Sequence, residues 1–194
     1  MATADSDALD RADMERLARG QDVALNDLME RHATGVFRFL CGMLANEDDA
    51  NDLAQETFVR VYQHRAGFKR GAKFTPWLYT IAANLARNQI RWRTRHPNVS
   101  LEAEVDDGVP PLREALPATT ATPSEDAEAA ERVVAVRAAV TRLPDDLRQA
   151  VVLCEWEDLA VAEAAEVLNT TAKAVESRLY RARQLLRERL KRWL

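Results

Sequence analysis

The residues of this chain best suited to bind a ligand lie between Thr75 and Arg95, where cations and aromatic rings share the segment TPWLYTIAANLARNQIRWRTR. The formal net charge of the chain is −4, yet the stretch from Thr57 to Leu101 holds nine Lys and Arg residues and no Asp or Glu. The side chains of interest are Arg87, Arg91, Arg93 and Arg95, interleaved with Trp77, Tyr79, Asn84, Asn88 and Trp92. Such a mixture indicates stacking on unpaired bases and reading of an exposed base edge. Equally well, Trp77 and Tyr79 could be core residues, the usual role of aromatics at helical spacing.

A second basic segment lies near the carboxyl terminus, in LAVAEAAEVLNTTAKAVESRLYRARQLLRERL. A short amphipathic helix, a tight turn and a longer basic helix form a helix-turn-helix, in which Ala165 permits close crossing and Asn169 can adopt the left-handed turn conformation. Apolar residues at spacings of four and three predict the buried side of the second helix: Val175, Leu179, Ala182 and Leu186. The outward side is then Lys173, Ser177, Arg178 and Arg181. These residues favour binding in the major groove of DNA over a merely solvated basic face.

An acidic stripe precedes the first basic segment. Asp49, Asp52, Gln55 and Glu56 recur at spacings of three and four, so one exposed helix face carries them. Negative charge beside a nucleic-acid surface repels DNA, so the stripe suits a protein partner with a basic face. Simple solvation is the alternative reading of the same charge pattern.

The elements that position these groups are predicted to be helices. Gly and Pro are few, and apolar residues recur mostly at spacings of three and four. For the helix over 47–64 we expect Asn46 as the cap, with acids in its first turn, and Pro76 opens the helix that reaches Arg95. The remaining predicted helices span 7–19, 124–143, 144–156, 161–168 and 172–193, and residues 22–44 are predicted to form one or two helices.

Residues 97–123 differ in composition from the rest of the chain, since they are rich in Pro, Thr, Ala and acids. The alternating apolar residues between Val99 and Val105 find no partner strand elsewhere in the sequence. We therefore predict an all-α protein of two small helical domains, residues 1–96 and 124–194, joined by a flexible acidic linker over 97–123, with the helix-turn-helix in the second domain.

Several classes of protein fit poorly. No apolar run approaches the roughly 20 residues that cross a bilayer, and the first residues do not form a secretory leader, so we expect a cytoplasmic protein without membrane insertion. Cys41 and Cys154 lack close metal-ligand partners and are expected to pack as small hydrophobes. The three His residues are isolated and no Gly-rich phosphate loop occurs, so we expect neither an enzyme nor a cofactor or metal.

Two long stretches of the sequence resemble a known family. DDANDLAQETFVRVYQHRAGFKRGAKFTPWLYTIAANLARNQIRWRTR resembles the second region of bacterial RNA polymerase sigma factors. LPDDLRQAVVLCEWEDLAVAEAAEVLNTTAKAVESRLYRARQLL resembles their fourth region. The small two-region layout is similar to the extracytoplasmic-function (ECF) class, which implies a factor that binds core RNA polymerase and directs initiation at specific promoters.

The resemblance also implies roles for individual residues. Asp52, Gln55 and Glu56, with Asp49 beside them, match the face that docks on the polymerase. The part that melts and reads the minus-ten element matches Lys73, Phe74, Trp77, Asn84, Arg87, Asn88 and Arg91. The reader of the minus-thirty-five element matches Lys173, Ala174, Glu176, Ser177, Arg178 and Arg181. Partners would be core polymerase, promoter DNA and an anti-sigma factor, since sigma factors of this size are commonly held inactive by one.

Departures from the family pattern bear on the promoter sequence. The family usually carries an acid at Asn51 and often an acid near Asn88 and a glycine near Asn169. It also often carries a threonine at Ala174 and a lysine at Glu176. Glu176 places a negative charge on the presumed DNA-facing helix, where it could accept a hydrogen bond from a cytosine amino group or repel phosphate. The alternative function is a conventional dimeric helix-turn-helix regulator, which would bind palindromic duplexes without polymerase.

Overall fold

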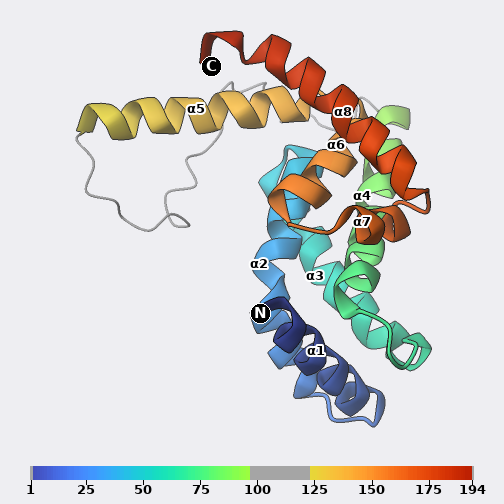
Figure 1. Cartoon of the computed structure of the whole chain (residues 1–194). Helices are drawn as coiled ribbons and strands as arrows, with labels where there is room; N and C mark the ends of the chain where they lie inside the picture. The colour runs from blue at the N-terminus through green and yellow to red at the C-terminus, as the bar shows by residue number, and fades with distance from the viewer. Residues whose placement is uncertain (1, 97–122, 194) are drawn as a thin grey trace.

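The computed structural model describes residues 2–96 and 123–193, and every regular element in these two ranges is helical (Figure 1). The all-α class predicted from the sequence is confirmed. The N-terminal half, residues 2–96, contains α1 (Ala2–Ala18), α2 (Ala24–Leu44), α3 (Glu47–His64), the 3-10 turn η1 (Arg65–Gly67) and α4 (Phe74–Arg95). The C-terminal half, residues 123–193, contains α5 (Pro123–Thr141), α6 (Asp145–Val151), η2 (Val152–Trp156), α7 (Val161–Val167), α8 (Ala172–Arg189) and η3 (Lys191–Trp193). Apart from Pro123, the predicted linker lies outside the described residues.

Local sequence signals explain where the functional helices begin. The side chain of Asn46 accepts a hydrogen bond from the backbone N–H of Asp49 at 2.8 Å, which caps α3 as predicted. Asn169 has a φ of 49°, the left-handed conformation expected in the turn before α8. Thr171 then caps α8 by accepting a hydrogen bond from the N–H of Ala174 at 3.2 Å. Short-range chemistry therefore sets the start of both helices.

The predicted helix over 144–156 is confirmed in extent, but its second half has a different helical geometry. Regular α6 ends at Val151, and the chain continues as a π-helical turn, η2, from Val152 to Trp156. The N–H of Glu157 donates to the carbonyl of Val152 at 3.1 Å, which closes the widened turn. Trp156, the last residue of the turn, and Glu157, which follows it, both contact the N-terminal half.

Helix α1 is attached to α2 through a buried charged cluster. Asp10 is fully buried, and its carboxylate accepts a hydrogen bond from Arg31 at 2.9 Å and lies 2.8 Å from Nε2 of His32. Arg31 also donates to Asp13 at 2.6 Å. A buried carboxylate is tolerated only when its oxygens have partners, and here both have one. Because these contacts join residues about twenty positions apart, helical periodicity did not reveal them.

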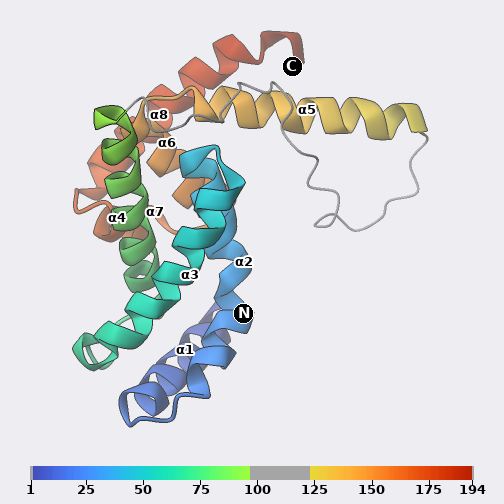
Figure 2. The same ribbon diagram turned by 180° about the vertical axis from the view of Figure 1, so that it is seen from behind.

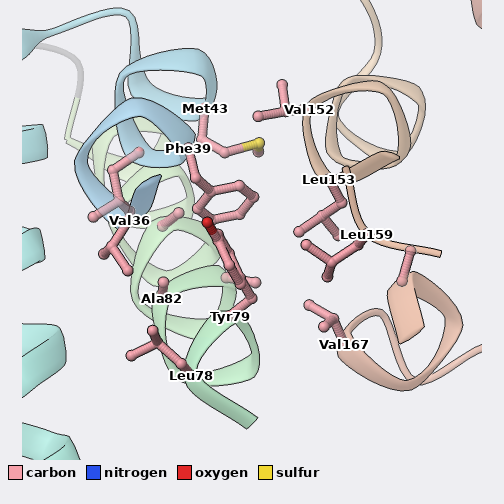
Figure 3. Close-up of a cluster of buried hydrophobic side chains, with 14 of the residues drawn as sticks. Val36, Phe39, Met43, Leu78, Tyr79, Ala82, Val152, Leu153, Leu159 and Val167 are labelled. Atoms are coloured by element: carbon pink, nitrogen blue, oxygen red, sulfur yellow. The ribbon is translucent and has the colours of Figure 1, made fainter. Parts of the chain in front are cut away.

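The two halves share one hydrophobic core. Figure 3 shows side chains of α2 and α4 facing side chains of η2, α7 and the segment between them. The labelled members are Val36, Phe39, Met43, Leu78, Tyr79 and Ala82 on one side, and Val152, Leu153, Leu159 and Val167 on the other. In Figures 1 and 2, α6, α7 and the start of α8 lie against the N-terminal half, whereas the first turns of α5 extend away from it. No helix in the described part of the chain is long and apolar enough to span a membrane.

Candidate nucleic-acid and partner interfaces

One face of α4 presents most of the residues predicted to contact unpaired DNA. Asn84, Asn88 and Arg91 are exposed, and Arg87 is half-buried beside them. Arg87 donates to the side-chain oxygen of Asn84 at 2.6 Å and to the carbonyl of Ala83 at 3.3 Å. Partial burial, together with the nearby charge of Arg91, lowers the pKa of Arg87, although it stays cationic near neutrality. The face thus combines fixed positive charge with amides able to pair with a base edge.

The aromatic residues at the start of α4 divide between core and surface. Phe74 and Tyr79 are buried, and Phe74 packs with its ring centroid 5.1 Å from that of His32. Trp77 is half-buried, and its ring lies edge-on to Phe68 at 5.2 Å and tilted to Phe74 at 6.0 Å. Tyr79 is therefore a core residue, one of the two roles that the sequence allowed for it. Phe74 was predicted to contact DNA, but its ring has no exposed surface in this conformation, so we assign it the support of Trp77.

Lys73 is exposed at the residue before α4 and already has anionic neighbours. Its Nζ lies 2.6 Å from Glu163 of α7 and 3.7 Å from Asp7 of α1. These carboxylates raise the pKa of Lys73, with the Glu163 hydrogen bond as the largest cause. One candidate DNA contact is thus occupied by an acid of the C-terminal half.

Helix α8 presents the second predicted DNA-binding surface. Val175, Leu179 and Ala182 are buried and Leu186 is half-buried, as their spacing predicted. The opposite side carries Lys173, Glu176, Ser177 and Arg181, all exposed, with Ala174 and Arg178 half-buried. Arg178 and Arg181 each lie just under 4 Å from Asp146, at 3.8 and 3.9 Å, so their ion pairs are weak and the arginines remain available to DNA.

The acidic stripe of α3 is split between the surface and a contact inside the molecule. Asp52 and Gln55 are exposed, and Glu56 pairs with Arg60 at 2.8 Å. Asp49 instead accepts a hydrogen bond from Gln89 of α4 at 3.1 Å and forms an ion pair with Arg93. The four predicted residues therefore share a helix but not one environment.

Sequence reasoning missed an apolar member of the same face. Val59 is 47% exposed and lies one turn after Gln55 and Glu56 on α3. The sequence could have revealed Val59, because position 59 continues the spacing of three and four residues that links Asp52, Gln55 and Glu56. A single exposed aliphatic side chain is common on protein surfaces, so Val59 extends this face of α3 without by itself indicating a partner.

The described residues offer no metal centre, since nowhere among them do three His, Cys, Asp or Glu side chains form a group able to hold an ion. Cys41 and Cys154 are both half-buried free thiols packed against the core. Burial raises the pKa of the Cys41 thiol to about 11, with a further contribution from the charge of Glu47. Burial likewise raises the pKa of Cys154. These thiols are poor nucleophiles at neutral pH.

The fold and its two basic surfaces define a class, a helical DNA-binding protein with a carboxyl-terminal helix-turn-helix. Comparison with known proteins makes the class specific. Residues 28–96 match the family model for Sigma-70 region 2, and residues 134–186 match that for Sigma-70, region 4.

Curated relatives match over nearly the whole chain. The RNA polymerase sigma factor CarQ of Myxococcus xanthus is 36% identical over 177 residues, which cover 91% of this chain and 95% of CarQ. The ECF RNA polymerase sigma factor SigW of Bacillus subtilis is 29% identical over 180 residues, 92% of this chain and 95% of SigW. The chain belongs to the ECF family of RNA polymerase sigma factors.

Solved structures of similar fold include complexes with other proteins. CnrH in complex with the cytosolic domain of CnrY aligns with a TM-score of 0.69 and 24% identity, covering 94% of this chain and 97% of the other. The sigma factor RpoE of Bartonella quintana, in complex with the anti-sigma factor NepR, aligns with a TM-score of 0.64 and 25% identity, covering 86% and 96%. The arrangement of helices is thus one that solved structures also contain.

The raised pKa of Cys41 leads to a prediction about thiol reactivity. At pH 8 a thiol with a pKa of about 11 is ionised to about one part in a thousand, so alkylation by iodoacetamide should be on the order of a hundredfold slower than for an ordinary thiol. The alkylation rate of Cys41 should keep rising from pH 8 to pH 10, whereas the rate of an exposed cysteine levels off within this interval. Peptide mapping by mass spectrometry measures each cysteine separately. Equal rates in native protein and in concentrated urea would contradict the prediction.

Proposed function

We propose that this protein is a dissociable subunit of bacterial RNA polymerase that docks through α3, opens and reads the minus-ten element with α4, and reads the minus-thirty-five element with α8. The observation that carries the proposal is the exposed stripe of Asn84, Asn88 and Arg91 on α4, which begins near a half-buried Trp77. The arginine can attract phosphate and the two amides can pair with base edges, and all three lie on one helix. Membership of the ECF family supports the same assignment.

The protein itself would perform no bond chemistry. Stacking of an unpaired base on an aromatic ring contributes about 1–3 kcal/mol, against a cost of a few kcal/mol for unstacking it from the duplex. Binding energy for the open strand can therefore drive melting, provided the polymerase holds the DNA in place. Such a subunit works where the polymerase does, in the cytoplasm.

An anti-sigma factor is the second proposed partner. The solved structure of RpoE contains an anti-sigma factor, NepR. The exposed part of the acidic α3 face, with Val59 beside it, is a surface that such a partner could cover in competition with the polymerase. The conventional dimeric regulator is not favoured, because it leaves the exposed face of α4 without a role.

The function is tested by run-off transcription with bacterial core polymerase on a promoter library, with and without the protein. We expect a set of start sites that appear only when the protein is present. If every transcript is independent of it, the proposal fails.

Docking through α3 predicts the effect of charge reversal. Changing Asp52 and Glu56 together to Arg should weaken binding to core polymerase by about a hundredfold, about 3 kcal/mol, because like charges would then face the basic partner surface. Binding is measured by co-purification and by biolayer interferometry. The matched control reverses Glu30 and Glu166, which are exposed acids elsewhere on the molecule. Equal loss in both variants would show a general charge effect and remove the docking assignment.

The role of Trp77 is tested by separating strand opening from initial binding. Trp77→Ala should slow opening on the order of tenfold, measured by permanganate reactivity of promoter thymines, while leaving the closed complex nearly unchanged. Trp77→Phe should lose less, because it keeps a ring against Phe68 and Phe74. Thermal melting of both variants checks their folding. Equal loss of closed and open complexes in Trp77→Ala would favour a purely structural tryptophan.

A further inference from the structure

A pocket outside both reading surfaces lies between α1 and the segment that joins α3 to α4. It has a volume of about 360 Å³, which falls within the range of small-molecule sites, roughly 300–1,000 Å³. Among the described residues, those that line it include none that we assign to the polymerase or to promoter DNA. Its cationic members come from α1, from η1 and from the loop before α4, and they are Arg11, Arg19, Arg65 and Arg70.

The lining of this pocket carries more positive charge than its own acid offsets. Glu15 is its one acidic member among the described residues, and its carboxylate lies 3.3 Å from Arg19 with both side chains exposed. Such an exposed pair is weak. None of the described carboxylates forms an ion pair with Arg11, Arg65 or Arg70. The lining therefore has a formal surplus of three positive charges, which an anion would balance.

Two of the arginines are held in place by local structure. Arg65 donates to the carbonyl of Tyr62 at 2.6 Å, and its guanidinium carbon lies 4.0 Å from the centroid of the Tyr62 ring. A guanidinium has five N–H donors, so these contacts leave others for a ligand. Arg70 precedes Gly71, whose φ of 80° is the left-handed conformation that a tight turn needs, so the backbone at Arg70 is fixed. Donors positioned in advance reduce the entropy lost when a ligand binds.

The pocket also has an apolar wall. Met14 and Phe68 line it, the first buried and the second half-buried. The ring of Phe68 packs against Trp77, which lies edge-on to it at 5.2 Å and fixes its position. An aromatic ring beside guanidiniums combines a stacking surface for a base with donors for phosphate oxygens. The lining therefore suits a nucleotide, which brings both groups.

We infer that this pocket binds a phosphate-bearing ligand, a nucleotide whose phosphates contact the four arginines and whose base packs on Phe68. The nucleotide is either free or part of an unpaired strand that passes beyond Trp77, because both present the same chemistry. The pocket belongs to the isolated chain and needs neither polymerase nor a promoter, so this site goes beyond the proposed function. A ligand that bridges α1 and the loop before α4 should also raise the melting temperature of the free protein.

The site is tested by isothermal titration calorimetry of the full chain with ATP, inorganic tripolyphosphate and oligothymidylate. The pocket variant changes Arg11 and Arg70 together to Gln, which removes two charges and keeps polar side chains. We expect its affinity for the probe that occupies the site to fall on the order of tenfold or more, because charge-assisted hydrogen bonds to phosphate are lost. The matched control changes Arg132 and Arg142 to Gln, which are exposed arginines of the C-terminal half, and should keep the parent's affinity.

A change at the aromatic wall separates the base from the phosphates. Phe68→Leu should weaken ATP binding about tenfold, because it removes a stacking surface, and should leave tripolyphosphate, which has no base, unchanged. Thermal melting of each variant without ligand checks that it folds. An equal loss of affinity for both probes would remove the role of Phe68 as a wall for a base.

The three probes also decide the source of the nucleotide. Loss of affinity for ATP and tripolyphosphate in the pocket variant supports a free nucleotide, whereas loss confined to oligothymidylate supports a nucleotide of an unpaired strand. If the parent binds none of the probes, or if the pocket variant and its control lose affinity equally, the site does not exist. Calorimetry uses neither polymerase nor promoter, so a failure of run-off transcription would overturn the proposed function and leave the pocket as inferred.

Discussion

Helix α2 has to bury apolar surface on several sides at once, and the rest of the structure follows from that requirement. Its residues Val36, Phe39 and Leu40 are fully buried, and α1, α3, α4 and the C-terminal half all pack on it. Because α1, α3 and α4 each turn their apolar side toward α2, their polar residues face outward. The acidic face of α3 and the basic face of α4 are therefore positioned by the same core.

The acidic side chains of the protein neutralise only part of the surfaces that we propose to bind DNA. Asp49 neutralises Arg93, and Glu163 neutralises Lys73, but Asn84, Asn88 and Arg91 remain exposed. Surface ion pairs contribute about 0–1 kcal/mol, so DNA phosphates can replace these internal partners at little cost. An acidic chain can thus carry a basic surface, because carboxylates on neighbouring helices offset only part of its positive charge.

Local features of the fold could be predicted from the sequence, and features set by long-range packing could not. The Asn46 cap, the left-handed Asn169 and the buried side of α8 depend on residues within a few positions of each other. The burial of Phe74 and the Asp49–Arg93 pair depend on which helices meet, which periodicity does not specify. The π turn after Val151 was missed for the same reason, since Trp156 and Glu157 find their partners on α2 and α4.

The contact between the two halves combines apolar packing with one buried ion pair. The apolar side chains of α2 and α4 that face η2 and α7 gain stability with every buried methyl group, so they supply most of the favourable free energy. The carboxylate of Glu157, held by the guanidinium of Arg38 and the phenol of Tyr79, gains Coulomb energy but loses much of it to its own desolvation. A carboxylate buried without these two donors would be costly, so the ion pair restricts which arrangement of the apolar surfaces is acceptable. Apolar burial therefore stabilises the contact, and the polar group limits its geometry.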